Sequence, residues 1–144
     1  MNISENGLNL IKSFEGFSSV PYLCPAGKMT VGYGHVIKKG ELCDKITESE
    51  AMKLLLDDVK WVEKAIQDFI TVFLTQNQYD ALCSFIYNVG KNAFANSTLL
   101  ALLNDKEYGL AADQFSRWCH IGKEVSAGLL SRRNTERALF EQYA

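Results

Sequence analysis

Three residues near the N-terminus are of the types that can break a glycosidic bond: Glu15, Cys24 and Thr30. This reaction needs an acid that protonates the leaving oxygen, and a group on the opposite face of the sugar that activates water or attacks directly. Glu15 can be that acid if partial burial keeps its carboxyl group protonated near neutral pH. Cys24 and Thr30 can hold the water across a cleft. The spacing alone also fits a simpler interpretation, in which Glu15 is a paired surface acid and Cys24 an idle thiol.

The segment before Glu15 is predicted to be a helix. Ser4 is a typical N-cap, and apolar residues recur three positions apart at Leu8, Ile11 and Phe14. Gly16 ends the helix and leaves Glu15 in its last turn. Because a helix C-terminus disfavours negative charge, a carboxylate at this position indicates a function or a pairing with a cation.

Residues 17–37 are predicted to form short strands. If residues 29–35 form one strand, alternate side chains face opposite sides. Thr30 then shares a face with Gly32 and Gly34. Two glycines beside Thr30 leave a shelf without side chains, which a sugar ring or another backbone can approach.

His35 is predicted to be a structural histidine that is bonded to a carboxylate. A Cys24–His35 pair would be the arrangement of a cysteine peptidase that cuts cell-wall peptides. In a strand over residues 29–35, however, His35 lies on the face opposite Thr30. The strand pattern therefore disfavours the peptidase pair.

The rest of the chain is predicted to be a helical body, which makes the fold α+β and mainly helical. Thr47 and Glu50 form a capping box before a long amphipathic helix with apolar residues at Met52, Leu55, Val59, Val62 and Ile66. Thr75 and Gln78 begin a second helix, apolar on nearly all sides, that Gly90 ends. Further predicted elements are helices at Ser97–Leu103 and Glu107–Cys119, a loop bracketed by Gly122 and Gly128, and a last helix at Leu129–Tyr143.

Composition limits the class of protein. A chain of 144 residues fits one domain, and its net charge of −2 gives no argument for a nucleic-acid partner. No apolar run reaches the roughly 18 residues of a membrane span, and the N-terminus lacks the features of a secretion signal. The four cysteines form no CxxC pair, which argues against a zinc knuckle and suits a reduced cytoplasmic protein. Two of them, Cys83 and Cys119, lie among apolar helical positions and are predicted to be buried thiols.

One motif resembles a known family. Glu15 is followed after eight residues by Cys24 and after five more by Thr30, which opens the sequence Thr-Val-Gly-Tyr-Gly-His. This pattern closely resembles that of the phage-type lysozymes, the muramidase endolysins of bacteriophages. Further similar segments follow in the same order over essentially the whole chain, at residues 76–82, 87–90, 94–97 and 128–133.

The resemblance implies a two-lobed fold within a single catalytic domain, residues 1–144. A small hairpin-bearing lobe, at about residues 16–46, would join a helical lobe through a long helix. The substrate would be peptidoglycan, cut at the β-1,4 bond between N-acetylmuramic acid and N-acetylglucosamine. Glu15 would be the proton donor, Cys24 would occupy the second catalytic position and Thr30 would position water.

The resemblance also implies residues that bind the saccharide and a residue that supports Glu15. Val36, Tyr87 and Ser97 would line the saccharide cleft, although Tyr87 could equally be a core residue. In relatives an arginine near the start of the last helix approaches the catalytic glutamate, so Arg132 or its neighbour is expected to pair with Glu15. This pairing creates a tension, because a nearby cation lowers the pKa of a carboxyl group while an acid catalyst needs a high one.

Cys24 departs from the aspartate that many relatives carry. A free thiol with a pKa of about 8.5 is only a few per cent ionised at neutral pH. Three hypotheses remain open: a general base with a lowered pKa, a thiol that orients water, or a nucleophile that gives retention. Two other functions also stay open, a peptidoglycan-binding module without turnover and a cysteine endopeptidase acting on wall peptides.

We expect a monomer that needs no metal or organic cofactor, with peptidoglycan as its partner and no stable insertion into a membrane. Without an export signal, such an enzyme would wait in the host cytoplasm. A separate pore-forming protein would then admit it to the periplasm and the cell wall.

Overall fold

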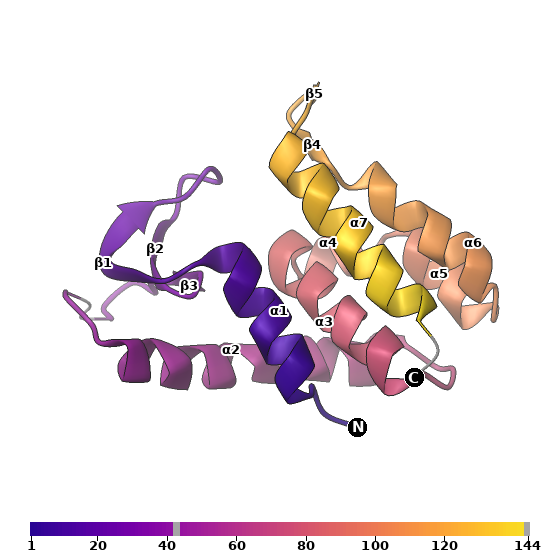
Figure 1. Ribbon diagram of the computed structural model, residues 1–144, viewed down its shortest axis with the longest axis horizontal. Coiled ribbons are helices and arrows are strands. Elements are labelled where there is room, and N and C mark those ends of the chain that lie inside the picture. The colour runs from indigo at the N-terminus through magenta and orange to yellow at the C-terminus, as the bar shows by residue number, and fades with distance from the viewer. Residues whose placement is uncertain (42–43, 143–144) are drawn as a thin grey trace.

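The computed structural model describes residues 1–41 and 44–142. Figure 1 shows a small sheet on one side, a group of helices on the other, and one long helix that runs below both. The sheet contains β1 (Ser18–Leu23), β2 (Met29–Gly32) and β3 (His35–Val36), and the long helix is α2 (Glu48–Phe69). The predicted α+β, mainly helical class is confirmed.

Helix α1 (Glu5–Glu15) has the predicted ends. The Ser4 side chain accepts a hydrogen bond from the Gly7 N–H, which satisfies one of the free donors at the helix start. Gly16 follows with a φ of +67°, a conformation that glycine adopts without strain. Glu15 is therefore the last residue of α1, where the chain turns into the sheet.

The prediction of one strand over residues 29–35 is wrong. β2 ends at Gly32, and the chain reverses so that β3 pairs antiparallel with β2. Gly32 and Gly34 permit this reversal because both have positive φ angles, +67° and +80°. Val36 lies opposite Thr30 in the new register, and His35 lies opposite Val31, so His35 is still on the face away from Thr30.

Both capping boxes are present. Thr47 and Glu50 cap α2, and Thr75 and Gln78 cap α3 (Gln76–Val89), through reciprocal bonds between side chain and backbone. The predicted central burial of α3 is also confirmed, because every residue from Tyr79 to Ile86 is buried. The polar members of that stretch, Asp80 and Ser84, bind α1 and α7 respectively.

The remaining elements are α4 (Lys91–Ala95), α5 (Thr98–Asn104), α6 (Tyr108–Gln114), the 3-10 helix η1 (Phe115–Arg117), β4 (His120–Ile121), β5 (Glu124–Val125) and α7 (Ala127–Glu141). The predicted helix at Glu107–Cys119 is shorter and tightens into η1. β4 lies before the predicted loop that Gly122 and Gly128 bracket, β5 lies within it, and Gly128 lies inside α7. Tyr143, the expected last helical residue, lies outside the described residues.

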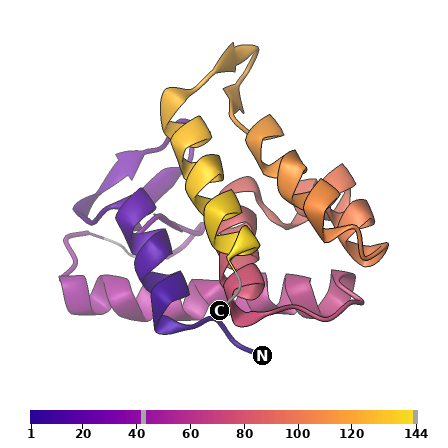
Figure 2. The same ribbon diagram turned by 45° about the vertical axis from the view of Figure 1, so that its right-hand side comes forward.

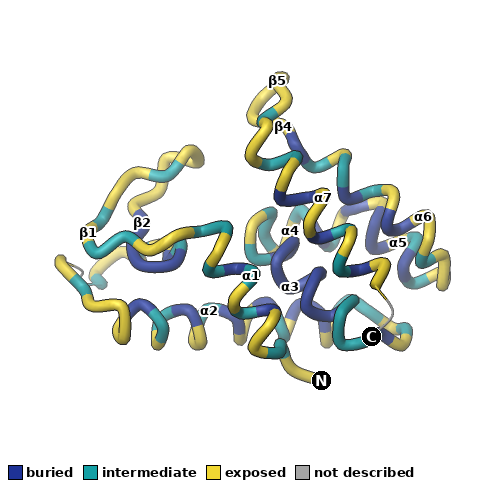
Figure 3. The backbone as a smooth tube through the Cα atoms, viewed as in Figure 1, coloured by how far each residue is buried: buried dark blue, intermediate teal, exposed yellow. Residues whose placement is uncertain are grey.

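Two hydrophobic cores hold the structure. The larger surrounds α3 and includes Phe85, Phe94 and Phe115, while α3 packs against both α1 and α7 (Figure 2). The smaller core joins α1 and α2 to the sheet and consists of Ile11, Tyr33, Ala51, Leu55 and Val59. Figure 3 shows buried residues concentrated in α3, whereas exposed residues gather at the end of β1 and in the turn that follows it. No helix among the described residues is both long and apolar enough to cross a membrane.

Candidate active site

Glu15 lies where the two lobes meet. Its Oε2 atom accepts a hydrogen bond of 2.6 Å from Nη1 of Arg132, which comes from α7 in the helical lobe. The guanidinium also lies over the ring of Phe14, 5.0 Å from its centre. The expected pairing between Glu15 and Arg132 is therefore present, and it ties the end of α1 to the helical lobe.

Arg132 is itself held by buried groups. Its Nη2 donates to the Ser84 backbone oxygen at 3.0 Å, and its Nε donates to Oε2 of Glu136 at 3.2 Å. Glu136 is fully buried and also pairs with Arg133 at 2.7 Å. Arg132 and Arg133 thus face the carboxylates of Glu15 and Glu136. Arg132, the cation beside Glu15, therefore also pairs with Glu136.

Glu136 was not identified from the sequence. The available signal was its spacing from Arg132, four positions along one helix, which places the two side chains on the same helix face. That spacing is common on solvated helices, and only the packing of α7 against α3 buries it here.

Gly34 leaves room for the Glu15 carboxylate. A Cβ atom on Gly34 would lie 2.5 Å from Oε1 of Glu15, well inside van der Waals contact. The φ of +80° at Gly34 also disfavours any side chain. The shelf without side chains that was expected beside Thr30 is therefore partly filled by the carboxylate of Glu15.

Cys24 and Thr30 lie together on the sheet. Cys24 follows β1, its backbone N–H donates to the Lys28 oxygen at 2.9 Å, and Thr30 is buried in β2. The pKa of the Cys24 thiol is lowered, first by backbone hydrogen bonding at Lys28 and then by the Thr30 side chain. Both interactions favour the thiolate, the form that can take a proton from water or act as a nucleophile.

Tyr22 joins these residues, although the sequence analysis did not single it out. It pairs with Thr30 across β1 and β2, which places both side chains on one face of the sheet. Burial raises the pKa of the Tyr22 hydroxyl, and the negative charges of Glu15 and Cys24 raise it further. Tyr22 therefore lies within electrostatic reach of both catalytic candidates.

His35 has the predicted structural role. Its Nδ1 lies 2.7 Å from Asp58 on α2, and its Nε2 lies 3.0 Å from Glu41. Burial lowers the pKa of His35, but the hydrogen bonds and charges of these two carboxylates outweigh it and raise the pKa overall. The pKa of Asp58 is nevertheless raised, because its own burial outweighs the attraction of His35. His35 thus fastens β3 to α2.

The three expected cleft residues have different surroundings. Val36 is exposed and lies opposite Thr30. Tyr87 bridges the lobes, because its hydroxyl donates to the Tyr33 oxygen at 2.7 Å and its ring stacks on Trp61. Ser97 is buried, and its hydroxyl caps α5 and donates to the Phe94 oxygen at 2.7 Å. The structure thus places Tyr87 between the lobes and Val36 on the exposed part of β3, and it commits the Ser97 hydroxyl to the backbone.

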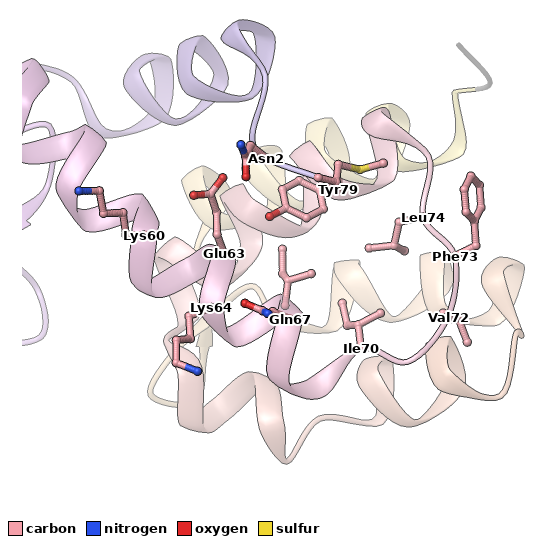
Figure 4. A pocket seen from close by; sticks show the side chains of 12 residues that line it. Asn2, Lys60, Glu63, Lys64, Gln67, Ile70, Val72, Phe73, Leu74 and Tyr79 are labelled. Carbon is pink, nitrogen blue, oxygen red and sulfur yellow. The ribbon is translucent and has the colours of Figure 1, made fainter.

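A separate cavity of about 670 Å³ lies away from these residues. It is bounded by the second half of α2, the loop that follows α2 and the first residues of the chain (Figure 4). None of the candidate site residues lines it, so this cavity is separate from the candidate site.

The placement of an acid at the junction of a sheet lobe and a helical lobe, with reactive groups on the facing strands, defines a lysozyme-type glycoside hydrolase. Comparisons with known proteins give the family. The family model described as phage lysozyme matches residues 12–136. The chain belongs to the phage lysozyme family, and it is a muramidase that degrades peptidoglycan.

Similar proteins cover nearly the whole chain. The endolysin of Acyrthosiphon pisum secondary endosymbiont phage 1 is 44% identical over 98% of this chain and 99% of its own length. The endolysin of Salmonella phage P22 is 46% identical over 97% of this chain and 98% of its own length. A crystal structure of a P22 lysozyme mutant matches with a TM-score of 0.86 and 45% identity, over 99% of both chains.

Proposed function

We propose that the enzyme hydrolyses the β-1,4 bond between N-acetylmuramic acid and N-acetylglucosamine, with Glu15 as the proton donor. The observation that carries this proposal is the position of the Glu15 carboxylate. It is held by Arg132 and fits against Gly34, within electrostatic reach of the sheet face that bears Cys24 and Thr30. A general acid must lie within hydrogen-bond reach of the oxygen that it protonates, and a sugar in this junction would meet Glu15 on one side.

The second half of the reaction takes place on the other face of the sugar. In our proposal the Cys24 thiolate accepts a proton from a water molecule, and the resulting hydroxide attacks the anomeric carbon while Glu15 protonates the leaving oxygen. Thr30 orients that water by accepting a hydrogen bond from it, because the hydroxyl proton of Thr30 is donated to the Lys28 oxygen at 3.0 Å. The lowered pKa of Cys24 supports this proposal over an inert thiol.

Direct attack by Cys24 is the alternative path. The thiolate would then form a covalent bond to the anomeric carbon, and a second step with water would release the sugar with retention. We favour water activation, because a thiolate beside a hydroxyl group can stand in for the aspartate that many relatives carry at this position.

Substitution of Cys24 tests its role. The Cys24→Asp variant, whose carboxylate is ionised at neutral pH, is expected to keep peptidoglycan hydrolysis. The Cys24→Ala variant, which can neither accept a proton nor attack, is expected to lose about 100-fold or more of the rate. Equal rates for wild type and Cys24→Ala would remove Cys24 from the mechanism.

One digestion separates this function from the two alternatives. Purified peptidoglycan treated with the enzyme is expected to gain reducing ends at N-acetylmuramic acid. New free amino groups would indicate a peptidase, and binding without release would indicate a binding module. The bonds that His35 makes to Asp58 and Glu41 disfavour the peptidase, because they leave His35 no ring nitrogen for Cys24.

Binding and access belong to the same proposal. We assign Val36 and Tyr87 to the saccharide cleft, and we restrict Ser97 to a supporting role through its cap on α5. The enzyme would act as a single-domain monomer, without metal, cofactor or nucleic acid. It would remain in the host cytoplasm until a separate pore-forming protein lets it reach the wall.

A further inference from the structure

Tyr22 lies on the face of the sheet that carries the reactive groups. It is opposite Thr30 in the antiparallel pair of β1 and β2, and it precedes Cys24 by two positions, the repeat that returns a strand to the same face. Side chains directly opposite each other in such a pair have Cβ atoms about 5 Å apart. Tyr22 as a whole residue is 37% exposed, so it is accessible from outside the core.

The hydroxyl group of Tyr22 is free of bonds to the described residues. Three other tyrosines are engaged: Tyr33 donates to Glu48, Tyr87 donates to the Tyr33 oxygen and Tyr108 donates to the Phe73 oxygen. Tyr79 also shows no such bond within the described part of the chain, but it is buried in the larger core. A hydroxyl group near two catalytic candidates, with no acceptor in the described part of the chain, can donate to a ligand.

Its protonation state suits that role. Burial and the charges of Glu15 and Cys24 raise the pKa of Tyr22 above its ordinary value of about 10. The phenol therefore keeps its proton over the whole range in which a muramidase works. Burial raises the pKa of Tyr87, which is assigned to the cleft, and the charges of Asp58 and Glu15 raise it further, so Tyr87 and Tyr22 both lie within electrostatic reach of Glu15.

We propose that Tyr22 is a substrate-contacting residue whose hydroxyl donates a hydrogen bond to an oxygen of the sugar held between Glu15 and Cys24. The acceptor is a hydroxyl or acetamido oxygen, the groups that an amino sugar offers. This inference rests on the proposed function, because it places the sugar at the same site. A hydrogen bond of this kind restrains the ring between acid and water and strengthens as the transition state is reached.

The Tyr22→Phe variant tests the proposal, because it removes one oxygen and keeps the ring. We expect kcat/KM for the release of reducing ends from solubilised peptidoglycan strands to fall about tenfold, mainly through kcat, with an unchanged Tm. Tyr108→Phe is the matched control in the helical lobe. It loses the bond to the Phe73 oxygen and is expected to keep the wild-type kcat and KM.

The outcomes separate this inference from the proposed function when Glu15→Gln is measured in parallel. An inactive Glu15→Gln together with a tenfold slower Tyr22→Phe supports both. An inactive Glu15→Gln with wild-type kcat and KM in Tyr22→Phe overturns the role of Tyr22 alone. Full activity of Glu15→Gln overturns the proposed function. A loss in Tyr22→Phe that is accompanied by a lower Tm and restored on cooling overturns substrate contact in favour of a structural role.

Discussion

The sheet lobe and the helical lobe contribute to the active site in different ways. The sheet lobe carries Cys24 and Thr30 on short, partly exposed strands that rest on a small core and are fastened to α2 by His35. The helical lobe contributes Arg132, a charge fixed by buried partners beside the large core around α3. One lobe presents reactive groups and the other supplies a rigid electrostatic anchor. Glu15 itself belongs to α1, so its carboxylate is positioned from both lobes, by Arg132 of α7 and by the space beside Gly34.

The largest effect is expected from closing the space that the sheet lobe leaves for Glu15. In Gly34→Ala the new Cβ would lie 2.5 Å from Oε1 of Glu15, so the carboxylate must move off its position. We expect peptidoglycan hydrolysis to fall about 1,000-fold, as for the loss of a general acid. Gly122→Ala is the matched control, because Gly122 also has a positive φ but has nothing within 4 Å of the added atom. Similar rates for the two variants would contradict the role of Gly34.

Truncation of one core residue in each lobe is expected to destabilise the protein to different extents. Phe85 is fully buried among Phe94, Phe115 and Trp118, and Phe85→Ala is expected to lower the free energy of unfolding of the whole chain by about 3–5 kcal/mol. Leu55 belongs to the smaller core of five buried residues, and because a Leu side chain is smaller than Phe, Leu55→Ala is expected to cost about 2–3 kcal/mol. Urea unfolding measures both energies. Hydrogen exchange should show the Leu55→Ala loss first in β1–β3, and equal loosening of α3 would contradict the separation of the lobes.

The smallest expected effect is a pH dependence of the folding stability, which arises from His35 in the sheet lobe. The pKa of His35 is raised in the folded protein above its ordinary value of about 6.5. Its bonds to Asp58 and Glu41 therefore add stability that is fully present below that value and is lost as the pH rises through the folded pKa. His35→Asn is expected to cost about 1.5–3 kcal/mol at pH 6 and less at pH 9. Thermal unfolding across this range measures the difference, and a cost that does not depend on pH would contradict the assignment.

Local signals in the sequence predicted much of the fold. The caps at Ser4, Thr47 and Thr75 fixed the starts of α1, α2 and α3, because a cap depends on residues within one turn. The end of β2 was missed, since alternation continues through Tyr33 and Gly34 although the backbone reverses there. The β4–β5 hairpin was also missed, because its two-residue strands are too short to show a period.

The candidate site was predicted less completely. The motif gave Glu15, Cys24 and Thr30, and the carboxylate bonds of His35 followed from its residue type. Glu136 and Tyr22 required the structure. A buried partner of Arg132 depends on how α7 packs, and the Tyr22 hydroxyl, which has no bond to the residues that the structure describes, depends on the strand register. Both are properties of contacts between distant segments, which spacing along the chain does not contain.

The role of Glu15 as the proton donor is best tested by replacing it with glutamine, its amide. Glu15→Gln keeps the shape of the side chain at the lobe junction but cannot hand a proton to the leaving oxygen. The release of reducing ends from purified peptidoglycan should fall by about 1,000-fold, while the unfolding transition remains cooperative. A rate within a few-fold of the wild type would contradict the account.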